Sequence, residues 1–289
     1  MTPQQLAPFS IRMFLPGGTP EGIRIVEKSN WVGRAIAGPR SRFDELRKRP
    51  EFSKTGVYVL TGQPDPDGLP TVYIGEGDPV ADRLISHYKA KDFWSAAVFF
   101  INNGKDDHLN KAHFQYLEAR LVGLAKEAKR CVLDNANVPQ RPTLSEMDAA
   151  DMEVFLEQML QICGVLGINV FQKAAGAVHS TRLLSIRAGD GLTEATGYEV
   201  DEGFVVRAGS LSRKDPAPTI PAHIQRLRQS LLEQGVFVDE KDRYRVVQDY
   251  TFSSPSMAAA VMLARSANGR VEWKDDQDKT LKEMQEEVS

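Results

Sequence analysis

The chain has 289 residues, of which 42% are apolar and 26% are charged, and its formal net charge is -3 at pH 7. These values exclude an intrinsically disordered chain and allow two modest domains. The small negative charge also excludes binding to nucleic acid through overall basicity, although it leaves a local basic patch open.

Residues 1–53 are expected to form a β–α extension. Strand-like runs at 11–15 and 22–26 flank a Pro-Gly-Gly turn, which predicts a short β unit. Residues 31–50 are predicted to be helical, with a break at Gly38-Pro39. The basic run that ends this segment is typical of a solvated face, or else it contacts phosphate, with Arg47 as its candidate substrate-binding residue.

Residues 54–170 are predicted to form one α+β domain. Strands, a turn and helices are expected in the order strand, turn, strand, helix, strand, helix, helix, at residues 56–60, 64–68, 71–75, 79–88, 95–101, 107–129 and 146–166. Asp78 is expected to cap the first of these helices, with Pro79 at its first helical position.

Two tyrosines in the first two strands form the first part of a candidate site. Because side chains alternate between the two faces of a strand, Tyr58 and Tyr73 on neighbouring strands can direct their hydroxyls at one point. Such a pair can hold a water molecule or accept a proton. The alternative interpretation is that each is a half-buried strand residue with its hydroxyl at the rim of the sheet.

Three charged or titratable residues on the following helices extend this candidate site. Arg83 and His87 are four residues apart and share one helix face, where a guanidinium can bind phosphate and an imidazole can hydrogen-bond a reacting water. Glu118 lies at the edge of the apolar stripe of its helix, and a single carboxylate with water ligands suits Mg²⁺ or Mn²⁺. The alternatives are a solvated polar face for Arg83 and His87 and a rim position for Glu118.

Other site chemistries are not predicted. Gly75-Glu76-Gly77 lacks the Lys and Ser/Thr of a phosphate-binding loop, and His108 and His113 lack a matching carboxylate pattern. Cys131 and Cys163 are far apart, which argues against a zinc site or a disulfide scaffold and suits a reducing compartment. Because the N-terminus has no signal-like pattern and no apolar run approaches about 20 residues, we expect a cytoplasmic protein with no membrane partner.

A second small α+β domain is predicted after a linker of small and polar residues. The linker is placed at 171–190, the domain at 191–274 and a charged, fraying tail at 275–289. Within the domain, strands are expected at 204–206, 244–247 and 271–273, and helices at 222–234 and 254–268.

Taken in chain order, the candidate site residues resemble the GIY-YIG nuclease superfamily. Gly-Val-Tyr at 56–58 and Tyr-Ile-Gly at 73–75 resemble its two motif strands, and the resemblance covers about residues 54–140. The residues that match its arginine, its histidine, its metal-binding glutamate and its closing asparagine are Arg83, His87, Glu118 and Asn135, or else Asn137.

This resemblance implies a fold, a cofactor and a reaction. The fold is a three-stranded antiparallel sheet flanked by helices, and the cofactor is one Mg²⁺ or Mn²⁺ at Glu118. The reaction is hydrolysis of DNA phosphodiester bonds, in phage defence, restriction or DNA processing. The resemblance makes Tyr58 the general base and lets Arg83 offset charge on the phosphate. Tyr73 and His87 then support the water, the base or the phosphate.

The expected partner is nucleic acid, most simply DNA, and its candidate binding residues are Asn135, Lys89 and Arg47. One alternative is a non-catalytic nucleic-acid-binding or regulatory protein that keeps the nuclease fold. A further alternative is a nuclease that acts on RNA or on a particular DNA structure. The intact set of site residues favours the catalytic interpretation, since a site that no longer catalyses the reaction is expected to have lost its arginine or its glutamate.

The C-terminal part resembles a small domain of unknown function that is often appended to such nucleases. The resemblance lies in residues 252–259 and in Asn268-Gly269 followed by Trp273. This resemblance implies an association with nucleases but no mechanism for the domain itself. Targeting or DNA docking is the expected role. The acidic balance of residues 151–289 argues against a non-specific DNA clamp and leaves a protein partner or self-association open.

Overall fold

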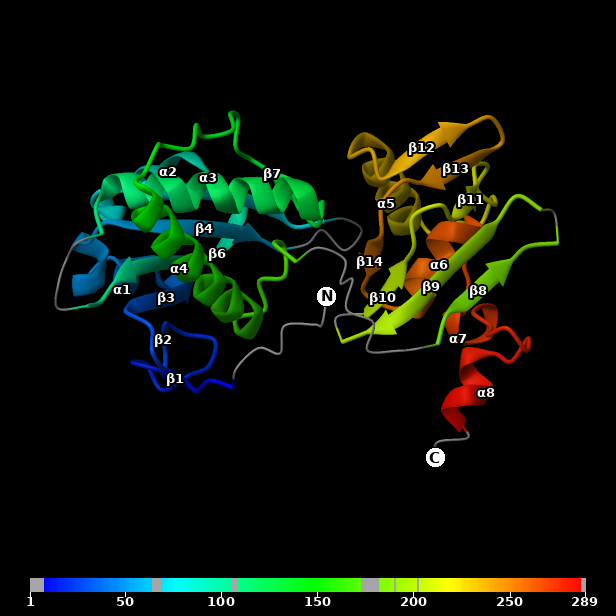
Figure 1. The fold of residues 1–289 in the computed structure, drawn as a ribbon, viewed down its shortest axis with the longest axis horizontal. Coiled ribbons are helices and arrows are strands. Elements are labelled where there is room, and N and C mark those ends of the chain that lie inside the picture. The colour runs from blue at the N-terminus through cyan, green and yellow to red at the C-terminus, as the bar shows by residue number, and fades with distance from the viewer. Residues whose placement is uncertain are drawn as a thin grey trace. The chain divides into compact units, whose positions relative to one another are not determined.

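The computed structural model describes residues 8–63, 69–104, 109–172, 182–189, 191–201 and 203–286. The chain divides into an N-terminal unit that runs to Gln172 and a C-terminal unit that begins beyond it (Figure 1). Each unit contains a seven-stranded sheet and helices, so the expected α+β fold class with a second α+β unit is confirmed. The expected turn at 64–68 and half of the expected linker, residues 173–181 and 190, lie outside the described residues.

The N-terminal unit is built on one sheet with the strand order β1-β2-β3-β6-β4-β5-β7. Its strands are β1 (Ile11–Phe14), β2 (Arg24–Lys28), β3 (Gly33–Pro39), β4 (Gly56–Gly62), β5 (Thr71–Gly77), β6 (Trp94–Asn102) and β7 (Val132–Leu133). All neighbours are antiparallel except β5 and β7. The three expected strands are therefore adjacent in the order β6-β4-β5 and are extended on both sides.

The helix expected over residues 31–50 is wrong for its first part. Residues 33–39 form β3, which pairs with β6 along its whole length, and only the short 3₁₀ helix Arg40–Arg42 and helix α1 (Phe43–Leu46) follow. Ala35 and Ile36 are fully buried, one towards each face of the sheet. Pairing and burial on both faces override local helix preference here. The N-terminal extension is thus part of the same sheet as residues 56–102.

Helices cover both faces of this sheet. Val57, Val59 and Ile74 pack into a core with α3 (Lys111–Ala128) and α4 (Glu146–Val165), whereas Tyr58 and Leu60 pack into a core with α1 and α2 (Val80–Ala90). The division follows from the two-residue alternation of strand side chains. Figure 1 shows α3 lying along the sheet.

The expected cap of the first long helix is wrong. Pro79 occupies the N-cap position of α2, and the Asp78 carboxylate instead accepts a hydrogen bond from the Thr55 hydroxyl at 2.6 Å. α3 begins at Lys111, after an Asn110 cap that forms a reciprocal capping box with His113. Its expected first turn at 107 and the histidine at 108 lie outside the described residues.

The C-terminal unit has the strand order β12-β13-β11-β9-β10-β14, with β8 paired to β9. Its strands are β8 (Leu184–Arg187), β9 (Glu194–Val200), β10 (Gly203–Val206), β11 (Leu211–Arg213), β12 (Phe237–Glu240), β13 (Arg243–Val246) and β14 (Tyr250–Phe252), and its helices are α5 (Ala222–Glu233), α6 (Pro255–Leu263), α7 (Gly269–Glu272) and α8 (Leu281–Glu286). β10, β13 and α5 lie where the sequence predicts them, and α6 begins where predicted but ends at Leu263 rather than near residue 268.

Three expectations for this unit are wrong. Residues 184–187 were expected in the linker but form β8, and residues 271–272 belong to helix α7 rather than to a last strand. The charged tail also does not simply fray, because α8 buries Leu281 and Met284 in the core of the unit. Two apolar side chains one helical turn apart are enough to hold this short helix against the core.

Among the helices of the described ranges, none is both long enough and apolar enough to cross a membrane.

Candidate functional site

The hairpin β4–β5 positions both candidate tyrosines. Tyr58 lies opposite Gly75 and Leu60 lies opposite Tyr73 in the strand register. Tyr58 is fully buried and Tyr73 is half-buried, and their ring centroids are 6.2 Å apart. The alternation of the two strands places both rings on the face that α2 covers.

Gly75 is required by the position of the Tyr58 side chain. A Cβ atom at residue 75 would overlap the Tyr58 hydroxyl oxygen and would also lie 3.0 Å from the Tyr73 ring. Because Tyr58 is fully buried, its ring has no open space to move into. The absence of a side chain at this position therefore lets one tyrosine lie across the neighbouring strand.

Gly75→Ala is therefore expected to destabilise the N-terminal unit by about 1–3 kcal/mol, the usual cost of forcing an extra methyl group into a packed core. Urea unfolding of the full chain measures this effect. Gly123→Ala is the matched control, since its added methyl group meets open space in the middle of α3. Equal stability of the Gly75→Ala variant and the wild type would contradict the role given to this glycine.

Helix α2 brings Arg83 and His87 to the tyrosines. Val80 and Leu84 are fully buried and anchor the helix on the sheet. The His87 ring lies 4.6 Å from the Tyr73 ring and 5.9 Å from the Tyr58 ring, between centroids. The Arg83 side chain is exposed, and its guanidinium interacts with the hydroxyls of both tyrosines.

Helix α3 brings Glu118 to the same region from the other face of the sheet. Leu117 and Leu121 are buried in the core, and Glu118 is half-buried beside them. Its carboxylate hydrogen-bonds the main chain of Glu76 on β5 and interacts electrostatically with Arg83 and with Tyr58. The five candidate residues Tyr58, Tyr73, Arg83, His87 and Glu118 are thus brought together around one end of β5.

The Asn135 side chain hydrogen-bonds the main chain of β5 at the edge of the sheet. Its side-chain oxygen accepts a hydrogen bond from the Ile74 amide at 3.1 Å, and its side-chain nitrogen donates to the Ile74 carbonyl at 2.7 Å. The amide thereby replaces a neighbouring strand where β7 has ended. Its two polar ends hold the main chain, so its geometry indicates a positioning role rather than the expected contact with substrate.

Two candidate substrate-binding residues are not brought to the site by the described contacts. Arg47 is exposed at the end of α1 and forms an ion pair with Asp44 at 3.0 Å. Lys89 is exposed in the last turn of α2, two residues from His87 and therefore on another side of the helix.

Burial shifts the pKa values of three site residues. It raises the pKa of the Tyr58 hydroxyl far above its ordinary value, and the Arg83 guanidinium opposes that shift only in part. Burial, and then the nearby Glu76 carboxylate, raise the pKa of Glu118 to about 7. Burial, followed by the charges of Lys91 and Arg83, lowers the pKa of His87 to about 4. At neutral pH the tyrosine is therefore protonated and the histidine is neutral.

The His87 shift predicts how the stability of the protein depends on pH. The pKa of His87 falls from 6.5 to about 4 on folding, so its neutral form stabilises the fold fully above about pH 6.5 and progressively less as the pH falls to about 4. We expect His87→Asn, which cannot take up a proton, to lose less stability between about pH 7 and about pH 4.5 than the wild type.

Thermal unfolding of both proteins across this range measures the difference. His223→Asn, in the C-terminal unit, is the control for removing a histidine elsewhere. An identical acid sensitivity of the His87→Asn variant and the wild type would contradict the predicted burial of a neutral imidazole.

Glu76 is a site residue that was not predicted from the sequence. Residues 74 and 76 share one face of β5, and Ile74 packs into the core on the α3 side, so Glu76 faces the helix that carries Glu118. Alternation along β5 would have placed it there.

Among the described residues, no three His, Cys, Asp or Glu side chains group closely enough to form a full protein ligand set for a metal.

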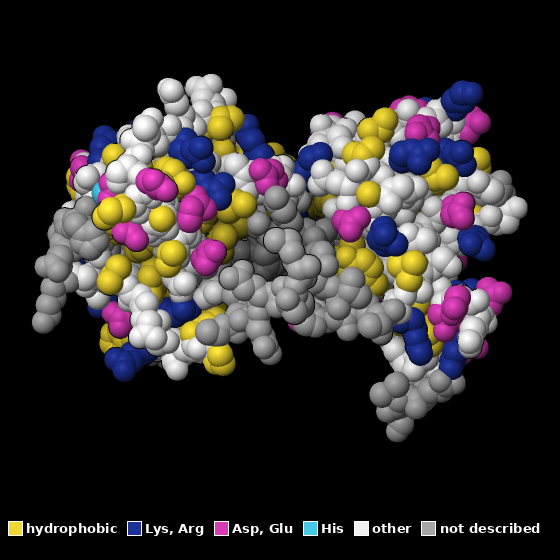
Figure 2. Space-filling view, in the orientation of Figure 1, with side chains coloured by type: hydrophobic (Ala, Val, Ile, Leu, Met, Phe, Trp, Pro, Cys, Tyr) yellow, Lys and Arg dark blue, Asp and Glu magenta, His cyan; other side chains and the backbone are white. Residues whose placement is uncertain are grey.

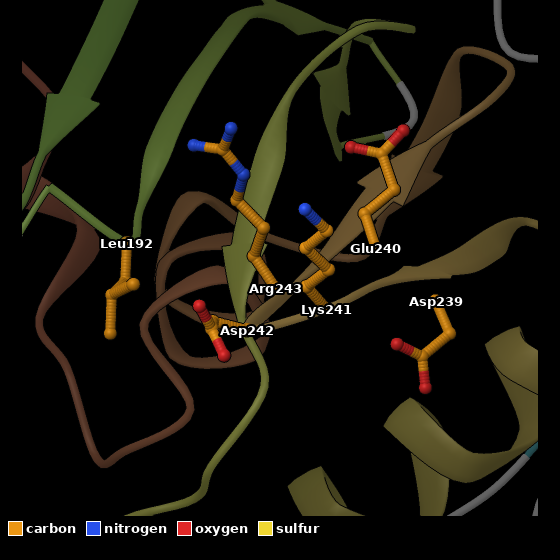
Figure 3. Close-up of a pocket in the computed structure, with 6 residues that line it drawn as sticks. All are labelled: Leu192, Asp239, Glu240, Lys241, Asp242 and Arg243. Atoms are coloured by element: carbon orange, nitrogen blue, oxygen red, sulfur yellow. The ribbon is translucent and has the colours of Figure 1, made fainter.

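The C-terminal unit carries a separate hollow of about 580 Å³. Figure 3 shows its lining, which comes from the β12–β13 turn and from one loop residue: Leu192, Asp239, Glu240, Lys241, Asp242 and Arg243. Asp239 pairs with Lys214 and Glu240 pairs with Arg245. Acidic and basic side chains are also interspersed on the visible face of each unit (Figure 2). The hollow is therefore lined by both acidic and basic side chains, and it does not favour a ligand of either charge.

Comparison with known protein families gives one match, to the C-terminal unit. The model of a "Domain of unknown function (DUF4357)" matches residues 184–285, about a third of the chain. The match spans β8 to α8, which agrees with the wider bounds that the structure gives this unit. No curated protein matched the chain, and no solved structure matched it.

Proposed function

We propose that the N-terminal unit is a GIY-YIG nuclease that hydrolyses DNA phosphodiester bonds with the aid of one divalent cation, Mg²⁺ or Mn²⁺. The observation that carries this proposal is the convergence of two tyrosines, an arginine, a histidine and a glutamate at one end of β5. These residues come from β4, β5, α2 and α3. The convergence combines a guanidinium for a phosphate with a carboxylate for a metal.

The residues at this site fit a hard divalent cation. Glu118 is half-buried, lies close to a second carboxylate, Glu76, and offers oxygen rather than nitrogen or sulfur ligands. Glu118 would hold the cation. When bound, such a cation stabilises negative charge on the leaving oxygen of the phosphodiester. It also offsets the repulsion between neighbouring carboxylates.

Three side chains of the protein supply the other parts of the proposed mechanism. Arg83 is exposed next to the Tyr58 hydroxyl, where it can bind a phosphate oxygen and offset charge that develops there. Because burial keeps Tyr58 protonated, its hydroxyl can act as a base only by passing its own proton on while it takes one from water. The proton from Tyr58 would pass to solvent, because the lowered pKa of His87 makes its imidazole a poor acceptor at neutral pH. His87 Nε2 has no hydrogen-bond partner within the described residues, so the neutral ring can hydrogen-bond the reacting water or a phosphate oxygen.

The test is cleavage by the purified full chain. Supercoiled plasmid, branched DNA and RNA are each incubated with Mg²⁺, with Mn²⁺ and with a chelator, beside the Glu118→Gln variant. We expect DNA cleavage by the wild type that requires the cation and is lost in the variant. Failure of the folded protein to cut any of these substrates would overturn the proposal and favour the non-catalytic alternative. Selective cutting of RNA would keep the chemistry but change the substrate.

A further inference from the structure

The main chain of β5 shows how Glu76 reaches the site. The amide and carbonyl of Ile74 point away from β4, since both bond to Asn135. In an antiparallel strand these directions repeat every two residues, so the Glu76 amide also points to the open edge. The hydrogen bond between this main chain and the Glu118 carboxylate is consistent with that direction. Glu118 therefore lies directly against the backbone of Glu76.

The side chain of Glu76 lies on the same side as Glu118. It projects towards the face that α3 covers, and it interacts electrostatically with Glu118 and with Arg83. One of its carboxylate oxygens, Oε2, is buried and has no hydrogen-bond partner among the described residues. A buried carboxylate oxygen without a donor is unfavourable unless a ligand satisfies it.

A second buried oxygen without a partner belongs to Tyr58, which interacts electrostatically with Glu118. The Tyr58 side chain is fully buried, and its hydroxyl lies across Gly75, the residue before Glu76. Within the described residues this hydroxyl has no hydrogen bond of good geometry, although the Arg83 guanidinium lies beside it. The two unsatisfied oxygens thus belong to side chains of neighbouring strands that both interact electrostatically with the Glu118 carboxylate.

We propose that Glu76 is a second carboxylate ligand of the divalent cation, acting together with Glu118 on the face of β5 that α3 covers. The inference rests on the proposed function, because it gives that site its second protein ligand. Mg²⁺ and Mn²⁺ prefer oxygen ligands and are commonly held by one or two carboxylates with water filling the other positions. Two carboxylates against one neighbouring guanidinium also leave the site with a net negative charge that a cation balances.

The test measures binding of Mn²⁺ to the full chain without DNA, by titration calorimetry or by the loss of the free Mn²⁺ resonance signal. Glu76→Gln and Glu118→Gln keep the shape of the side chains and remove one charge each. We expect each to weaken Mn²⁺ binding by about 10-fold or more, since the loss of even an outer-shell partner of a metal ligand typically costs about 10- to 100-fold in affinity. Glu157→Gln, which removes an exposed carboxylate from α4, is expected to bind as the wild type does.

A parallel measurement separates this inference from the proposed function. In cleavage assays, Glu76→Gln is expected to need a higher Mn²⁺ concentration for half-maximal rate. If Glu76→Gln binds Mn²⁺ as tightly as the wild type while Glu118→Gln does not, Glu76 is no ligand, but the nuclease proposal stands. If the wild type neither binds Mn²⁺ nor cuts DNA, both fail. Thermal unfolding without metal checks that both variants are folded.

Discussion

Arg83→Ala is expected to lower the rate of DNA cleavage by about 10²-fold or more, the scale of losing one group that stabilises charge in a transition state. Arg83 is a cation that interacts with Tyr58, Tyr73 and Glu118, so in the proposed reaction its loss removes positive charge from the point where phosphate charge would develop. Thermal stability is expected to change little, because the side chain is exposed and α2 is anchored by Val80 and Leu84.

Cleavage rates at saturating DNA measure this effect. Lys89→Ala is the matched control, since it removes a positive charge from another side of the same helix. Its effect on the rate is expected to be small. Arg83→Lys is expected to be intermediate, because an ammonium keeps the charge without the bidentate geometry. Equal effects of Arg83→Ala and Lys89→Ala would show that α2 contributes only general attraction for DNA.

The second large effect is expected in the C-terminal unit, at Arg228. This arginine on α5 is 4% exposed, and burial lowers its pKa to about 10. Its guanidinium donates to the Ser212 hydroxyl at 2.8 Å and to main-chain carbonyls, and it lies over two aromatic rings; these partners are Val261, Arg213, Lys214, Phe237 and Tyr244. One side chain thus ties α5 to β11 and to the end of α6.

Arg228→Ala is expected to destabilise this unit by about 3 kcal/mol or more, because it leaves a cavity and several buried carbonyl groups without donors. Hydrogen exchange followed by mass spectrometry measures the effect separately for peptides of each unit. Arg226→Ala, at an exposed position two residues earlier, is the control and is expected to cost little. Unchanged protection of α5, α6 and β11 in Arg228→Ala would contradict the structural role of this guanidinium.

Local patterns in the sequence predicted the parts of the fold that depend on neighbours along the chain. The strand-like runs at 56–60 and 71–75 predicted β4 and β5, each two residues shorter than observed, and helical spacing predicted α2, α3 and α4. These periods also decided which site residues could share a face, as for Arg83 and His87. A periodic pattern is local, so it can be read without knowing what packs against it.

The tertiary structure alone decided the features that depend on distant partners. Strand β3 forms because β6 offers it an edge, and α8 is held because the core of its unit accepts Leu281 and Met284. At the site, the Asn135 side chain substitutes for a strand beside Ile74 from 61 residues away.

The opposing pKa shifts of Glu118 and His87 likewise come first from burial, and that of Glu118 also from the Glu76 carboxylate on β5. Edge pairing, burial and charge proximity are all properties of residues separated in sequence, so the order of residues along the chain predicts which chemical groups the site contains. Only the packed structure decides which of them meet, as it does for Glu76 and Glu118, and in what state of protonation.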